Sequence, residues 1–202
     1  MLFEMNKRKF ESEKERNLYF KFFAGFYFNE LIRGYQERLK EFYGLLRHPA
    51  HPEGKDLFGE IQPSTTDVFV SFDNHVDRHV EGSKGEFADI LIHDQPNKLI
   101  IGVEAKFQDN WDYEKDIVGN GCRLQSMAGP LDANKQLLCL LVTETKWNNV
   151  VAKQNAEFSN YRKLDSTVVP TVVIQWEMLY ALQCVNPQVT SYMIAQLARG
   201  NR

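Results

Sequence analysis

The chain has 202 residues, a length that suits one domain of somewhat above-average size. Hydrophobic residues make up 43% and charged residues 25%, which is ordinary for a globular protein with a full core. The formal net charge is -3, so the composition excludes a strongly basic protein that binds a polyanion through its overall charge. Any contact with nucleic acid is therefore expected from a local patch, or through a metal ion that offsets phosphate charge.

The first expected element is a long helix from about residue 18 to about residue 47, or two helices broken near Gly25. Apolar residues recur at helical spacing in this segment, with polar residues between them. Pro49 and Pro52 end the helix, because proline disfavours the helical conformation at the preceding residue. Residues 48–66 are expected to form a loop.

Strands and two further helices are expected after this loop. Val68, Val70 and Phe72 show the alternation typical of a strand. Further strands are predicted over residues 87–92, 99–107, 136–143 and 171–176, and helices over residues 109–127 and 150–163. This order predicts a single α/β domain over residues 1–202, with a core at about 18–176 and a mixed central sheet flanked by helices.

The cysteines and the apolar runs indicate the cellular compartment of the protein. The three cysteines, Cys122, Cys139 and Cys184, are widely spaced, which indicates reduced thiols and not a disulfide framework or a zinc site. No apolar run reaches the ~20 residues that span a bilayer, and residues 4–16 are polar and charged where a signal peptide would be apolar. We therefore expect a cytoplasmic protein without membrane contact.

Asp89 is the one polar residue of a predicted strand whose two faces are otherwise apolar. A carboxylate in such a strand is costly unless it is paired or binds a cation. In the next predicted strand, Glu104 and Lys106 point to the same side because side chains alternate along a strand. Pairing about a turn centred on Pro96 places Asp89 near Val103, with Glu104 next door. Asp89, Glu104 and Lys106 are therefore expected to converge at one end of the sheet.

This combination of two acids and an amine indicates a metal-dependent reaction at phosphorus. Two converging carboxylates repel each other unless a cation joins them, and Mg²⁺ prefers one or two carboxylates together with water and phosphate oxygens. A lysine beside such an ion orients or deprotonates a water and offsets the charge that builds on phosphorus. A Glu-x-Lys pair by itself is more often a solvated ion pair, and the aspartate on the paired strand gives the pattern its weight. The pattern indicates hydrolysis of a phosphodiester bond, with Mg²⁺ or Mn²⁺ as cofactor.

Two stretches, GEFADILI over residues 85–92 and IGVEAK over residues 101–106, resemble the PD-(D/E)XK nuclease superfamily, also called restriction-endonuclease-like. That family has an αβββαβ core, and the elements expected between about residues 18 and 143 follow this order. Ala88 departs from the pattern, since many members have a proline before the aspartate.

The resemblance implies a role for each residue of the motif. Asp89 and Glu104 would hold Mg²⁺, the carbonyl oxygen of Ala105 would join them, and Lys106 would assist the attacking water. The implied substrate is nucleic acid, with DNA expected over RNA. A homodimer would help to cut two strands, but nothing in the sequence requires one.

The resemblance also points to residues on two helices. Many members carry a Glu on the first helix, for which Glu30 is the best candidate and Glu37 the alternative. A solvated helix carboxylate is at least as good an interpretation of each. Some members carry a Gln on the helix after the third strand, where Gln125 stands with Arg123 two residues before it.

Two alternatives to a nuclease remain. The chain is also consistent with a non-catalytic or regulatory module that keeps the nuclease fold and binds nucleic acid or protein, and the acidic pI of about 6.0 favours it. The other alternative is an unrelated α/β interaction protein in which Glu104 and Lys106 form a surface pair. That alternative requires Asp89 and Glu104 to lie far apart.

Overall fold

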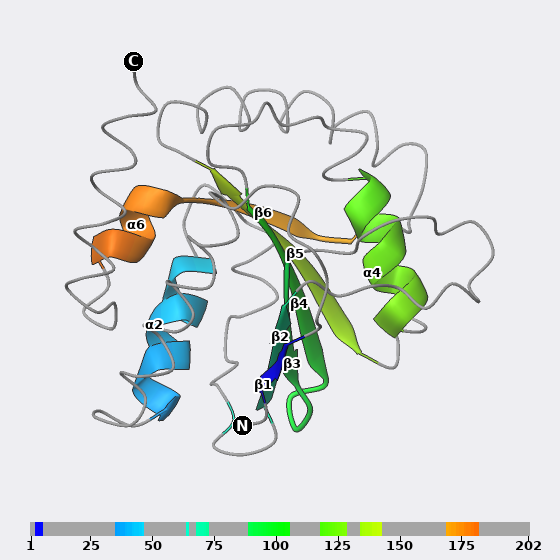
Figure 1. Cartoon of the computed structure of the whole chain (residues 1–202), viewed down its shortest axis with the longest axis horizontal. Coiled ribbons are helices and arrows are strands. Elements are labelled where there is room, and N and C mark those ends of the chain that lie inside the picture. Colours follow the sequence, from blue (N-terminus) through cyan, green and yellow to red (C-terminus); the bar gives the residue numbers. More distant parts are fainter. Residues whose placement is uncertain are drawn as a thin grey trace.

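The computed structural model describes residues 3–5, 35–46, 64, 68–72, 89–105, 118–128, 134–142 and 169–181. These residues form an α/β fold in which a mixed sheet lies between helices (Figure 1). The structure therefore confirms the predicted α/β class and the mixed central sheet.

The sheet has six strands in the described part of the chain, and their order in the sheet is their order in the sequence. The strands are β1 (Phe3–Met5), β2 (Val68–Phe72), β3 (Ile90–Asp94), β4 (Leu99–Ala105), β5 (Lys135–Val142) and β6 (Thr171–Gln175). Strands β2, β3 and β4 form an antiparallel meander, whereas β1 runs parallel to β2, and β4, β5 and β6 run parallel to one another. Neighbouring parallel strands need a crossover, and α4 (Asn120–Ala128) lies between β4 and β5 in the chain.

Helices lie on both sides of the sheet (Figure 1). On one side lie α2 (Tyr35–Leu46) and α6 (Trp176–Ala181), and α4 lies on the other. Helix α2 buries Phe42, Tyr43 and Leu46, and its last residue agrees with the end predicted near residue 47. None of the helices in the described residues is long and apolar enough to cross a membrane.

The core is densest along β4 and β5. Every described residue of β4 except Glu104 is buried, and the described apolar residues of β5 are buried throughout its length. A strand that is apolar on both faces has to be covered on both faces, and the helices on either side of the sheet supply that cover. The continuous apolar run from Leu137 to Val142 is the signal that predicted this arrangement.

Strand β3 differs from the prediction at both ends. The sequence predicts a strand over residues 87–92, whereas β3 begins at Ile90 and continues to Asp94, and Asp89 lies in a bend directly before it. The strand extends further because the carboxylate of Asp94, which would oppose burial, is hydrogen-bonded by several donors. The prediction that Asp89 lies within the strand is therefore wrong by one residue.

Other boundaries differ less. Strand β6 ends at Gln175 because Trp176, a buried residue, begins α6. Helix α4 begins at Asn120 and ends one residue beyond the predicted end, and the predicted start at residue 109 lies outside the described residues. The helix predicted over residues 150–163 also lies outside them. Strand β1 was not predicted, since three residues carry too short a pattern to be read as a strand.

Candidate functional site

Asp89 contacts the end of β4. Its Oδ2 atom accepts a hydrogen bond from the backbone N–H of Ala105, with an N···O distance of 2.8 Å. Ala105 is the last residue of β4 and stands between Glu104 and Lys106 in the chain. The first acid of the sequence motif therefore lies against the Glu-x-Lys segment.

The register of the β3–β4 hairpin places Asp89 level with Glu104. Ile90 pairs with Val103, so the next position out on each chain is Asp89 on one side and Glu104 on the other. The sequence places Asp89 near Val103 with Glu104 next door, and the observed register puts it level with Glu104. The reason is the turn, which has four residues: Lys98 N–H donates to the Gln95 carbonyl oxygen at 2.9 Å, and β4 begins directly afterwards.

Lys98 explains why the length of this turn was difficult to predict. It has a φ of 49°, in the left-handed region, and it is the residue with positive φ among the described non-glycine residues. That conformation is usual for glycine or asparagine, and lysine gives no sequence signal for it.

Glu104 lies on the face of β4 opposite that of Val103, and Asp89, in the bend before β3, is level with Glu104. Directly opposed residues of an antiparallel pair share a face, and side chains alternate along each strand. Asp94, on the opposite face, accepts a hydrogen bond from Tyr43 of α2. Helix α4 lies on the other side of the sheet from α2, so α4 covers the face to which Glu104 belongs (Figure 1). Both acids are half-buried.

Gln125 lies on that covering helix. It is half-buried, and on the same helix the Nη1 atom of Arg123 donates a hydrogen bond to the Oδ1 atom of Asn120 at 3.3 Å. Asn120 is itself 3% exposed, which places the N-terminal part of the helix close against the rest of the molecule. The structure therefore places Gln125 on the helix that covers the face of the sheet carrying Glu104.

Two predicted residues lie outside the described part of the chain. Lys106, the proposed amine, follows the last described residue of β4, and Glu30, the proposed first-helix acid, precedes α2. Glu37, the alternative to Glu30, lies within α2.

The donor set offered by the site is made of oxygen atoms. It comprises the carboxylates of Asp89 and Glu104 and the carbonyl of Ala105, which are hard ligands of the kind that Mg²⁺ and Mn²⁺ take. Mg²⁺ usually keeps several waters and uses only one or two protein carboxylates, so this set fits it chemically. Within the described residues, no group of three or more His, Cys, Asp or Glu side chains is arranged to hold a metal ion.

Asp94 is a residue that the sequence analysis did not single out. Its side chain is 0% exposed, and its Oδ2 atom accepts hydrogen bonds from the Tyr43 hydroxyl at 3.0 Å, the Ser64 N–H at 3.2 Å and the Asn97 side-chain amide at 2.8 Å. Its Oδ1 atom accepts hydrogen bonds from the Ser64 hydroxyl and from the Asn97 N–H at 3.4 Å. The only local signal is the asparagine three residues later, and the other donors lie far away in the sequence.

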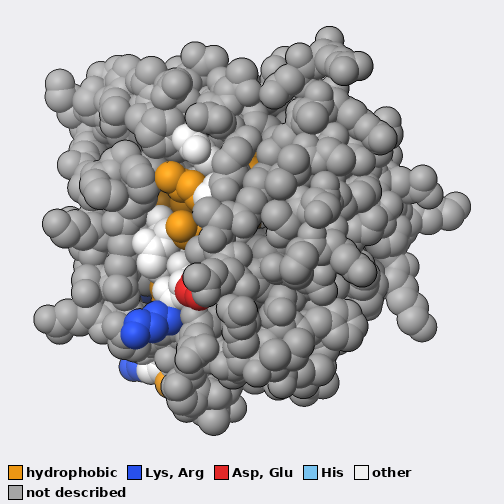
Figure 2. Space-filling model, turned by 90° about the vertical axis from the view of Figure 1, so that its left-hand side faces the viewer, with side chains coloured by type: hydrophobic (Ala, Val, Ile, Leu, Met, Phe, Trp, Pro, Cys, Tyr) orange, Lys and Arg blue, Asp and Glu red, His pale blue; other side chains and the backbone are white. Residues whose placement is uncertain are grey.

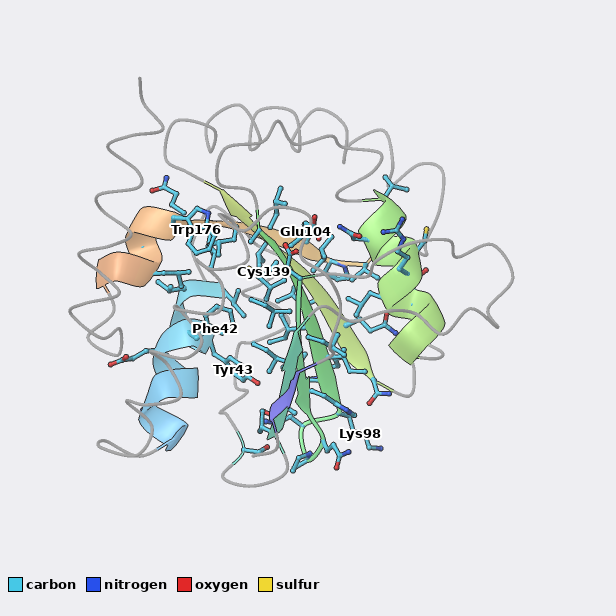
Figure 3. All side chains as sticks on the ribbon, in the orientation of Figure 1. Phe42, Tyr43, Lys98, Glu104, Cys139 and Trp176 are labelled. Carbon is cyan, nitrogen blue, oxygen red and sulfur yellow. The ribbon has the colours of Figure 1, made fainter. Side chains whose placement is uncertain are left out.

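The two acids and Asp94 occupy opposite ends of the hairpin. Figure 3 shows this separation through Glu104, at one end of β4, and Lys98, beside the turn at the other end. Tyr43 points from α2 toward the sheet in the same view.

Two further titratable groups are perturbed by burial. Burial lowers the pKa of His93, and the neighbouring Asp94 carboxylate partly opposes that shift. Burial raises the pKa of the Cys139 thiol, which favours the neutral form. Cys139 is therefore a core residue and not a candidate nucleophile, and Cys122 is exposed on α4.

The described side chains show no single sign of charge on the side where α2 lies. Figure 2 shows described hydrophobic side chains there, with acidic and basic side chains close to one another.

Comparisons of the chain with protein-family models, with curated proteins and with solved structures gave no significant match.

Proposed function

We propose that the protein is a metal-dependent nuclease of the PD-(D/E)XK type, which hydrolyses phosphodiester bonds with Mg²⁺ or Mn²⁺. DNA is the expected substrate. The single observation that carries this proposal is the hydrogen bond from the Ala105 N–H to the carboxylate of Asp89, because it joins the two separated parts of the sequence motif.

The order of the elements supports the proposal. Along the chain, α2, β2, β3, β4, α4 and β5 follow the αβββαβ order of the superfamily core. The two acids stand where β3 begins and where β4 ends, which are neighbouring positions in the antiparallel pair. A restriction-endonuclease-like core is therefore the finer description of the fold that we propose.

Each residue of the site has a proposed role. Asp89, Glu104 and the Ala105 carbonyl would hold the metal ion, which supplies a polarised water and offsets charge on the phosphate. Lys106 would orient the attacking water and stabilise the negative charge that develops on phosphorus. Gln125, on the covering helix, would contact a phosphate oxygen, and Glu30 would add an acid from the first helix.

A second function is favoured by one observation. The carboxylate of Asp89 satisfies the Ala105 N–H, which is also what a purely structural side chain at a strand end does. A module that keeps this fold and binds nucleic acid or protein without cleaving it is therefore the second candidate. The third alternative required widely separated acids, whereas the register places Asp89 level with Glu104.

Cleavage assays test the proposal directly. Purified protein is incubated with plasmid or single-stranded DNA, or with RNA, in Mg²⁺ or Mn²⁺, and the products are resolved on gels. We expect cleavage that is abolished by EDTA and lost in Asp89→Asn and Lys106→Ala.

The matched control is Lys135→Ala, which removes an exposed lysine from the start of β5 and should retain full activity. Cleavage that survives in both site variants would rule out this site. Metal binding measured by calorimetry, without cleavage of any substrate tested, would support the binding module instead.

A further inference from the structure

The donors to Asp94 come from three separate parts of the chain. Tyr43 belongs to α2, Ser64 precedes β2, and Asn97 belongs to the turn between β3 and β4. A buried carboxylate without such donors is strongly disfavoured. The end of β3 that carries Asp94 is therefore held in one position relative to both α2 and the turn.

The apolar pattern of the hairpin does not define its register completely. On the face shared with Asp94, β3 presents Ile90 and Ile92, and β4 presents Leu99, Ile101 and Val103. A slip by one residue would turn every side chain to the wrong face, and burial forbids it. A slip by two residues would again set apolar side chains opposite apolar side chains.

Asp94 distinguishes the observed register from a slip by two. If β3 slipped by two residues, Ile92 or Pro96, depending on the direction, would occupy the position of Asp94. The Tyr43 hydroxyl would then lose its acceptor in a buried environment. The two hydrogen bonds from Asn97 to Asp94 fix the number of residues in the turn, and thus the residue at which β4 begins.

The same slip would dismantle the candidate site. Two residues of strand correspond to a shift of about 6–7 Å. Such a shift would separate Asp89 from the Ala105 N–H, with which it now makes a 2.8 Å hydrogen bond, and from the level of Glu104.

We propose that Asp94 is a positioning residue that fixes the register of the β3–β4 hairpin and thereby holds Asp89 beside Ala105 and Glu104. It acts from the opposite face of the sheet and from the far end of the hairpin, so it has no direct contact with substrate. Its effect on metal binding rests on the proposed nuclease function, whereas its effect on the register does not.

The first test measures amide hydrogen exchange by NMR in the full-length Asp94→Asn variant. Asparagine keeps the size of the side chain but replaces one acceptor oxygen by a donor. We expect protection of the Ala105 amide to fall about tenfold more than protection of the β5 amides.

The matched control is Leu179→Ala, which destabilises the protein by removing a fully buried side chain of α6 that lies outside the hairpin. In this control, protection should fall uniformly. Tyr43→Phe removes only one donor to Asp94 and replaces Asp94→Asn in this test if that variant does not fold. We expect a smaller selective loss of protection at the Ala105 amide in Tyr43→Phe.

The second test measures Mn²⁺ binding by calorimetry in the same proteins. We expect Asp94→Asn to bind Mn²⁺ about tenfold more weakly than the wild type, as is usual when residues that support metal ligands are replaced. Leu179→Ala should bind within about twofold of the wild type if only the site geometry matters.

The outcomes separate the two proposals. Selective loss at Ala105 together with weakened Mn²⁺ binding supports both. Selective loss at Ala105 in a protein whose wild type binds no Mn²⁺ supports the register proposal and contradicts the nuclease. An unchanged hairpin register and a retained Ala105 amide in Asp94→Asn and Tyr43→Phe would overturn the role of Asp94.

Discussion

The two ends of the β3–β4 hairpin each carry an aspartate, and the two aspartates have different surroundings. Asp94 is fully buried, and donors from three segments hold both of its oxygens. Asp89 is half-buried and lies with Glu104 at a strand end. A buried acid surrounded by neutral donors is suited to structure, whereas an accessible acid beside a second acid is suited to binding a cation. The environment of each aspartate, and not its residue type, therefore suits it to its role.

The largest expected difference between the two ends of the hairpin is the effect of a substitution on cleavage activity. Asp89→Asn should lower the cleavage rate about a thousandfold, or about 4 kcal/mol, because a metal ligand is lost. It should lower the free energy of unfolding by only about 1 kcal/mol, because water can replace a half-buried partner. Single-turnover cleavage and urea unfolding measure the two effects. A variant that unfolds more easily but cleaves normally would reverse the assignment.

The next largest effect is expected in stability, at the other end. Asp94→Ala should lower the free energy of unfolding by about 3 kcal/mol or more, because it leaves several buried donors without an acceptor. Urea unfolding followed by circular dichroism, with the m-value checked for constancy, measures the loss. A loss below about 1 kcal/mol would show that the buried carboxylate is not structurally important.

A metal ion should stabilise the folded protein only by binding at the end of the hairpin that carries Asp89 and Glu104. At a concentration one hundred times its Kd, Mn²⁺ should raise the free energy of unfolding of the wild type by about 2.7 kcal/mol. Glu104→Gln should abolish most of this gain, because it removes one of two carboxylates. Thermal unfolding with and without Mn²⁺ gives the comparison, and Lys135→Ala is the control that should respond as the wild type does.

The smallest expected effect is a pH dependence at His93, beside Asp94. Because burial holds the pKa of His93 below its ordinary value of 6.5, the unfolded chain takes up a proton at higher pH than the folded protein. The stability contributed by neutral His93 is therefore complete above pH 6.5 and is lost as the pH falls toward the folded-state pKa. His93→Gln should flatten this part of the profile, measured as the urea midpoint at several pH values. An unchanged slope between the two proteins would contradict the contribution.

The fold was predictable where the signal was local and strong. The continuous apolar run of β5 and the alternation of β2 gave strands within one residue of their observed bounds. The helix end near residue 47 followed from the prolines beyond it. Strand β1 was missed because three residues cannot show a period, and its pairing with β2 spans more than sixty residues of sequence.

The site was predictable in part. Alternation along β4 and the hairpin turn were enough to bring Asp89 to the Glu-x-Lys segment. The sequence located Asp89 only to within one residue, near Val103 or Glu104, because Lys98 adopts a left-handed conformation without a sequence signal. Asp94 was missed because two of its donors, Tyr43 and Ser64, lie 51 and 30 residues away and are brought to it only by tertiary packing.

The order of the strands in the sheet also has a consequence for biosynthesis. Because each described strand pairs with the one before it in the sequence, the growing chain meets an already formed edge each time a new strand leaves the ribosome. This matters most for β5, whose unbroken run of aliphatic residues is the kind of segment that self-associates when it is left exposed. We expect β5 to pair first with the edge of the hairpin at β4, so that this aggregation-prone strand is exposed only briefly.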